Sequence, residues 1–124
     1  MEYVTLSNGV KMPILGYGVY QVTKDECERC VLDALDAGYR SIDTAQSYFN
    51  EKAVGRAIKK SGLPREEIFL ETKLWPAFYE QEDAVEKTLE RLDTEYIDLL
   101  LIHQPAGNYV AGYRQMEKAY KAGK

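Results

Sequence analysis

Residues 96–105 read YIDLLLIHQP, an apolar run that stops at His103, the only histidine of the chain. The segment LLLI is too uniformly apolar for a strand with one wet face, and it indicates a strand that is covered on both faces. Such strands are typical of parallel sheets, where helical crossovers lie against the faces. A histidine at this place can bind a metal, exchange a proton or fill a core position, and its partners decide among these roles.

Strand and helix patterns alternate through the rest of the chain. We expect strands at 14–20, 39–45, 67–75 and 96–103, and helices at 24–38, 50–62, 80–93 and 113–124. Asn8-Gly9 favours a two-residue turn, so a hairpin is expected at about residues 3–13. This order predicts an α/β fold in which four strand-helix units follow a hairpin and form a parallel sheet with right-handed crossovers.

Several residues mark the expected helix ends. Thr23 and Glu26 have the spacing of a capping box at the first helix, and Asn50 is the expected N-cap of the second. Gly38 and Gly62 are expected to end these two helices.

Length, composition and charge narrow the class of protein. The chain has 124 residues, of which 45% are hydrophobic and 29% charged, as expected for one globular domain. Its net charge of −4 argues against nucleic acid or an anionic membrane surface as the main partner. No apolar run could span a bilayer, and residues 1–20 lack a signal-peptide pattern, so a cytoplasmic location is expected.

Cys27 and Cys30 form a C-x-x-C pattern that has two explanations. A redox pair or half of a zinc site is one, but no second cysteine pair completes a zinc site. Two small apolar side chains on the inner face of a helix is the other. The second explanation is favoured, because the capping box places Cys27 inside the helix and not at its N-terminus.

Three expected strands end close to a side chain that can take part in proton chemistry: Asp43, Lys73 and His103. Each alone has a structural explanation, but in parallel α/β folds the carboxyl ends of the strands form the ligand site. Tyr48 follows the second strand and is a candidate acid. A free phenol titrates near pH 10, and a neighbouring ammonium stabilises phenolate, so Lys73 would make Tyr48 a better proton donor.

Among reaction classes, carbonyl reduction suits this set best. No serine or cysteine is paired with His103 in a recognisable motif, and one histidine with scattered carboxylates makes a poor metal site. A proton donor with a carbonyl-orienting histidine serves a reaction in which a cofactor supplies hydride. The cofactor site is not visible by itself, because GYGVYQ is not a dinucleotide fingerprint: Gln21 occupies the third glycine position.

Four segments together resemble the aldo-keto reductases: LSNGVKMPILGYGVYQ, GYRSIDTAQSYFNEKAVGRAI, PREEIFLETKLW and YIDLLLIHQP. The resemblance extends over the whole chain. The chain is similar to bacterial members such as 2,5-diketo-gluconate, glyoxal and methylglyoxal reductases. It implies a (β/α)8 TIM barrel that binds NADPH in an extended form without a Rossmann fold, and that reduces small aldehydes or ketones.

The resemblance also assigns roles residue by residue. Tyr48 would protonate the carbonyl oxygen, and Lys73 paired with Asp43 would lower the pKa of Tyr48. His103 would orient the substrate oxygen. The other expected contacts are with the cofactor, at Gly18, Asp43 and Thr44, and with the substrate, at Tyr20, Trp75 and Gln104.

Two departures from the family pattern matter. Gln104 stands where tryptophan is common, which changes the substrate pocket. A complete barrel takes about 250 residues, so the 124 residues correspond to its N-terminal half. The half expected to hold the amide-recognising Ser-Asn pair, the ring stacked on nicotinamide and the residues for the 2′-phosphate would be missing.

That shortfall leaves two alternatives to an active reductase. The chain could be a catalytically silent half barrel that associates with itself, or with a missing C-terminal half, through its open sheet edges. It could also be an unrelated α/β binding module of four units. A measured native mass and an NADPH oxidation assay would separate the first of these from the reductase.

Overall fold

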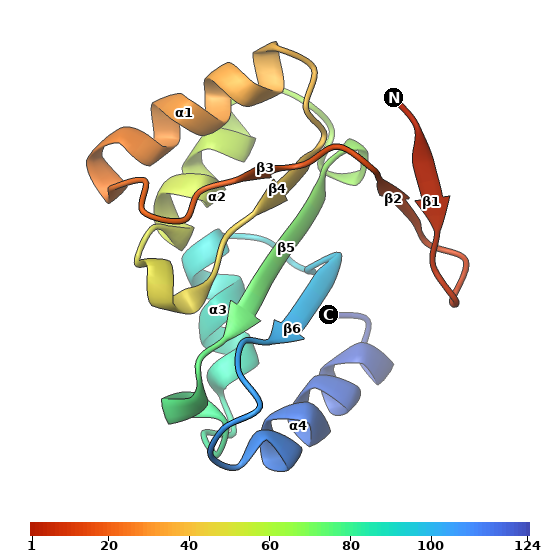
Figure 1. Cartoon of the computed structure of the whole chain (residues 1–124), viewed down its shortest axis with the longest axis vertical. Helices are drawn as coiled ribbons and strands as arrows, with labels where there is room; N and C mark the ends of the chain where they lie inside the picture. Colours follow the sequence, from red (N-terminus) through yellow and green to blue (C-terminus); the bar gives the residue numbers. More distant parts are fainter.

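The computed structural model describes all residues, 1–124. A two-stranded antiparallel hairpin, β1 (Tyr3–Thr5) and β2 (Lys11–Pro13), stands apart from a four-stranded parallel sheet (Figure 1). The sheet strands lie in the order β3 (Tyr17–Gly18), β4 (Ser41–Asp43), β5 (Phe69–Leu74) and β6 (Leu99–Ile102). The helices that follow them in turn are α1 (Lys24–Asp36), α2 (Glu51–Lys60), α3 (Ala84–Leu92) and α4 (Tyr109–Lys121). The predicted α/β order is therefore confirmed.

All four helices pack on one face of the sheet. Along each strand the side chains alternate, so Ile42 and Leu70 join a buried cluster with α1 and α2, and Leu74 and Ile102 join another with α3 and α4. The opposite face has no helices, and Leu101 on it is 36% exposed. The prediction that the 99–102 strand is covered on both faces is therefore wrong for this chain, because its helices supply a cover on one side only.

Helix boundaries follow the sequence signals in part. Gly38 and Gly62 follow α1 and α2 with φ of +108° and +73°, the left-handed conformation that glycine tolerates, as predicted. Thr23 and Asn50 precede the same helices, but neither side chain makes a capping hydrogen bond, so the expected capping box is absent. Helix α4 starts four residues before the expected 113, because the Asn108 side chain accepts a hydrogen bond from a backbone N–H of its first turn.

The hairpin turn has three residues and not the expected two. The Leu6 N–H donates to the Val10 carbonyl at 2.8 Å, which encloses residues 7–9. Gly9 has a φ of +86°, and the Asn8 side chain accepts from the Val10 N–H, so both residues of the predicted dipeptide still shape the turn.

The two cysteines are free thiols in the packing of α1. Cys27 is fully buried in the first cluster, and burial raises the pKa of its thiol to about 11. No group of three or more His, Cys, Asp or Glu side chains is arranged to hold a metal. Packing, the favoured explanation of the C-x-x-C pattern, is what the structure shows for Cys27.

None of the helices is both long and apolar enough to cross a membrane.

Helices α2 and α3 approach closely at Gly55. A Cβ atom at this position would lie 2.3 Å from the Leu92 carbonyl oxygen, which is backbone and cannot rotate away. Gly55 is therefore required by packing between helices, and the contact fixes α2 and the loop before it relative to α3.

We expect Gly55→Ala to lower the free energy of unfolding by about 1–3 kcal/mol, because the added methyl group forces α2 and α3 apart. Chemical denaturation of the chain measures this change. Lys52→Ala, at an exposed position of the same helix, is the matched control and should leave the midpoint nearly unchanged. Equal midpoints for both variants would show that the close approach contributes nothing to stability.

Candidate active site

Lys73 and Asp43 form an ion pair at the carboxyl ends of β4 and β5. The Lys73 ammonium also donates to the Thr44 carbonyl at 2.8 Å, so the lysine connects neighbouring strands. Its side chain is only 13% exposed and that of Asp43 is 36% exposed. A largely buried ammonium needs such partners, and together they fix its position on the open face of the sheet.

Tyr48 lies over this pair. It ends a single turn of 3-10 helix, Gln46–Tyr48. The Gln46 side chain accepts a hydrogen bond from the Trp75 N–H at 3.1 Å, which attaches this turn to the end of β5. The Lys73 ammonium nitrogen lies 5.1 Å from the centre of the Tyr48 ring. The phenol is therefore within range of the lysine charge, as the strand-end pattern predicted.

His103 completes the set directly after β6. Its ring is nearly perpendicular to the rings of Tyr48 and Trp75, at centroid distances of 5.9 and 5.3 Å, and the Ser47 hydroxyl lies 3.5 Å from its Nδ1. Burial lowers the pKa of His103, the Lys73 charge lowers it further, and Asp43 opposes them. The imidazole is therefore neutral at neutral pH and can donate one N–H and accept at the other nitrogen.

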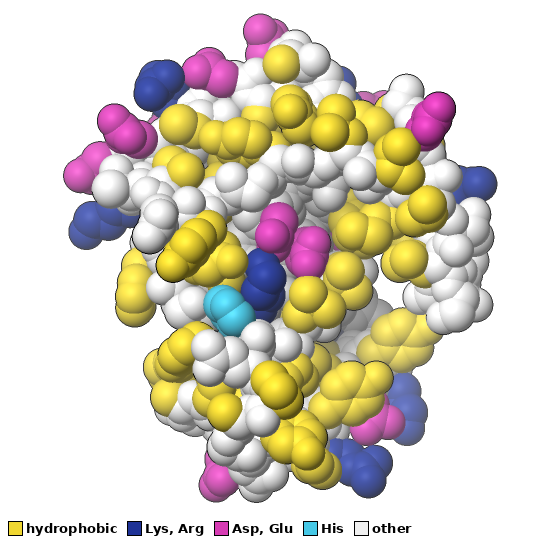
Figure 2. All heavy atoms as spheres, viewed as in Figure 1, with side chains coloured by type: hydrophobic (Ala, Val, Ile, Leu, Met, Phe, Trp, Pro, Cys, Tyr) yellow, Lys and Arg dark blue, Asp and Glu magenta, His cyan; other side chains and the backbone are white.

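Ser47 and Glu71 were not among the residues predicted from the sequence. Glu71 is half-buried and lies opposite Asp43 in the register of β4 and β5. Burial raises the pKa of Glu71, the Asp43 charge adds to the increase, and Lys73 opposes it. Side-chain alternation along β5 could have identified Glu71, because it stands two residues before Lys73 on the same face. Figure 2 shows the histidine in cyan beside basic and acidic side chains in a hollow of this face.

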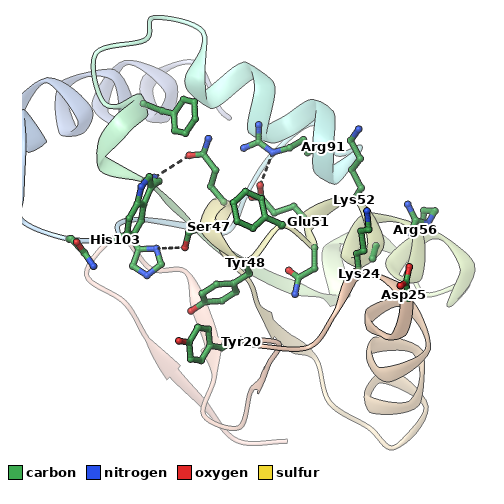
Figure 3. Close-up of a pocket in the computed structure, with 17 residues that line it drawn as sticks. Tyr20, Lys24, Asp25, Ser47, Tyr48, Glu51, Lys52, Arg56, Arg91 and His103 are labelled. Carbon is green, nitrogen blue, oxygen red and sulfur yellow. Dashed lines mark hydrogen bonds and ion pairs between the residues drawn. The ribbon is translucent and has the colours of Figure 1, made fainter.

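A groove runs along this edge of the sheet, and all three expected substrate residues line it: Tyr20, Trp75 and Gln104. Tyr20 packs against Tyr48 with ring centres 5.1 Å apart, and the two rings point into the same space (Figure 3). The Tyr79 hydroxyl donates to the Gln104 carbonyl at 2.9 Å and holds the loop after β6. Two aromatic residues that the sequence reading did not select, Phe49 and Phe78, also line the groove.

The expected cofactor residues differ in access. A Cβ atom at Gly18 would come within 3.9 Å of an Asp43 carboxylate oxygen, so the glycine leaves room above that carboxylate. Thr44, in contrast, is fully buried, and its hydroxyl donates to the Asn50 side chain at 2.6 Å. The Thr44 side chain is therefore engaged inside the protein, whereas Gly18 and Asp43 border open space, and the cofactor contacts of all three residues stay predictions.

Asn50 joins this network to the first loop. Its amide nitrogen donates to the carbonyls of Val19 and Val22, each at 3.0 Å, while its oxygen accepts from Thr44. The loop that carries Tyr20 is thereby attached to the end of β4. The predicted N-cap is thus a buried link between loops, and this role depends on a contact 31 residues away that no local pattern reveals.

Parallel strand-helix units that present aspartate, lysine, tyrosine and histidine at one edge define half of an α/β barrel with a polar site at its mouth. A sequence model of the Aldo/keto reductase family matches residues 7–124, and the chain belongs to this family.

The chain is similar to several members of this family. It is 48% identical to the glyoxal reductase of Bacillus subtilis, covering 99% of the chain and 46% of that protein. It is also 48% identical to the glycerol 2-dehydrogenase (NADP(+)) of Saccharomyces cerevisiae, over 85% of the chain and 34% of that protein. A solved putative 2,5-diketo-D-gluconic acid reductase B superposes with a TM-score of 0.91 at 39% identity, covering the whole chain and 46% of that structure. The chain thus spans about half the length, or less, of the proteins that it matches.

The lowered pKa of His103 can be tested directly, because the chain has one histidine. We expect its imidazole NMR signals to titrate below the ordinary pH 6.5. Lys73→Met should raise this pKa by removing a positive charge, and Asp43→Asn should lower it by removing a negative one. As the pH falls through 6.5 the unfolded state takes up the proton first, so this histidine reduces stability under acidic conditions. A shift in the same direction in both variants would contradict this electrostatic description.

Proposed function

We propose that this chain supplies the catalytic half of an NADPH-dependent reductase that converts aldehydes or ketones to alcohols. The observation that carries the proposal is the arrangement of four side chains at one sheet edge: the Lys73–Asp43 pair, the Tyr48 ring 5.1 Å from the lysine nitrogen, and neutral His103 against that ring. Membership in the Aldo/keto reductase family supports the same chemistry.

In this mechanism Tyr48 is the general acid. Its hydroxyl gives a proton to the carbonyl oxygen of the substrate as that oxygen gains negative charge. The Lys73 ammonium stabilises the resulting phenolate, and Asp43 keeps the ammonium charged and oriented. Glu71 is a second acidic side chain on this face, and burial together with the Asp43 charge raises the pKa of its carboxyl, which favours its neutral form beside the Lys73–Asp43 pair.

His103 has a different task, which is to orient the carbonyl group. A neutral imidazole can donate an N–H to the substrate oxygen without competing with Tyr48 as an acid. The Ser47 hydroxyl lies near Nδ1, which leaves Nε2 for the substrate. Burial and the Lys73 charge, which lower the pKa of His103, keep the ring in this neutral state.

NADPH would supply the hydride in this reaction. Gly18 and Asp43 are the residues of this chain that would lie against its reactive end, because the glycine leaves open space beside the carboxylate. The relative from Saccharomyces cerevisiae carries NADP(+) in its name, which favours the phosphorylated cofactor. Most of the remaining cofactor contacts would come from the other half of a complete barrel, since the chain spans about half of its relatives.

A second candidate applies to the 124-residue chain by itself. The outer strands β3 and β6 each have a free edge, and Leu101 is exposed on the uncovered face. Free edges and exposed leucine favour association with another sheet. In this state the chain would be a half barrel with little or no turnover.

The role of Tyr48 is tested in a complete barrel, made by joining residues 1–124 to the second half of the glyoxal reductase of Bacillus subtilis. Tyr48→Phe should reduce kcat/KM for an unactivated aldehyde about a hundredfold or more, the usual scale for loss of a general acid. Tyr113→Phe, at an exposed position on α4, is the matched control and should retain full activity. Near-normal turnover by Tyr48→Phe would remove Tyr48 from the mechanism.

A half barrel that needs a second half and a chain that is active by itself make opposite predictions for the 124 residues alone. If most of the cofactor site lies elsewhere, a fluorescence titration with NADPH should show weak or undetectable binding. A native mass measurement should show a dimer or a larger species, because association covers the free edges of β3 and β6. A submicromolar dissociation constant, or steady NADPH oxidation by a monomer, would instead show that this half builds a working site.

A further inference from the structure

Phe49 combines two unfavourable features. It follows Tyr48 directly and its side chain is 83% exposed to solvent. Its backbone has φ 59° and ψ 28°, the left-handed conformation that bulky side chains rarely adopt. Gln21 and Asp93 are the other residues apart from glycine with positive φ, and both are polar. An aromatic ring is therefore held in a strained and exposed position beside the proposed acid.

The position of Phe49 in the fold leaves its ring without cover from this chain. It lies after β4, an inner strand, and the loops that follow the neighbouring strands β3 and β5 both belong to this chain. Neither loop covers the ring. Phe49 instead lines the groove that contains Tyr48, Trp75 and His103.

The groove around Phe49 is lined by aromatic side chains and by charged ones such as Lys24, Lys52 and Arg56. Tyr20, Trp75 and Phe78 line the same groove, and Tyr20 stacks on Tyr48. An aromatic ring at a groove wall gains both apolar burial and ring contacts when a ligand covers it. A strained residue at the edge of a site is often retained for such a contact.

We propose that Phe49 is a specificity-determining residue that binds the aryl or long aliphatic part of a carbonyl substrate while Tyr48 and His103 engage its oxygen. The inference rests on the proposed function and narrows its substrates to carbonyl compounds with an extended apolar group. Small hydrophilic aldehydes would react without using this contact.

The test compares 3-phenylpropanal with propanal in the complete barrel described above, because the two aldehydes share the reacting group and differ in the phenyl ring. Phe49→Asn removes the ring and tolerates the left-handed backbone. It should lower the ratio of kcat/KM for 3-phenylpropanal to that for propanal about threefold to tenfold, the range expected for loss of one aromatic contact. Its unfolding temperature should be no lower than that of the unaltered protein.

Two variants serve as controls. Phe49→Tyr keeps the ring and should keep the ratio. Gln21→Asn changes another residue with positive φ, in the loop next to Tyr20, and leaves the groove lining unaltered. It should leave kcat/KM for both aldehydes unchanged. An unchanged ratio in Phe49→Asn, or an equal loss for both aldehydes, would overturn the inference, because the ring would then only shape the loop of Tyr48.

A binding measurement separates failure of this inference from failure of the proposed function. The chain has three phenylalanines, so ring-labelled protein gives few NMR signals, and Phe49→Asn assigns one of them. Titration of residues 1–124 with 3-phenylpropan-1-ol should shift the Phe49 signal. A complete barrel that turns over neither aldehyde contradicts the reductase, whereas a Phe49 signal that does not move contradicts the subsite.

Discussion

The ion pair between Lys73 and Asp43 is the contact on which the site depends. A lysine side chain that is 13% exposed would be unstable in this position without a carboxylate, and Asp43 comes from the neighbouring strand. The pairing requires β4 and β5 to be parallel and adjacent, with Lys73 two residues beyond the position that faces Asp43. The same charge lies 5.1 Å from the centre of the Tyr48 ring, and it adds to the effect of burial, which is the main cause of the lowered pKa of His103.

Thr44 extends this pair into the framework of the loops. Its carbonyl accepts from Lys73, and its hydroxyl donates to Asn50, which in turn donates to the carbonyls of Val19 and Val22. Each of these groups is buried or partly buried and each finds a partner, so the network is rigid where a partly satisfied one would be destabilising. A single chain of hydrogen bonds therefore positions the first loop relative to Lys73.

Helices cover only one face of the sheet, and this explains which parts of the site this half can form alone. Helices α1 to α4 protect one face, and the close approach at Gly55 fixes α2 against α3. The other face presents charged groups near its carboxyl edge and leucine side chains such as Leu101. The chain thus holds four proposed catalytic residues on a firm support, while the surface that would enclose a cofactor stays open on one side.

The sequence by itself determined the order of elements, because apolar periodicity, glycine helix ends and the alternation of strands and helices are local signals. It also placed Asp43, Lys73 and His103 at one edge, since strand ends in a parallel sheet meet there. Tertiary structure alone decided that Thr44 is buried, that Asn50 links loops, that Glu71 faces Asp43 and that Phe49 is exposed and strained. These properties depend on contacts between residues distant in the chain and on which sheet face the helices cover, and neither is encoded in a local pattern.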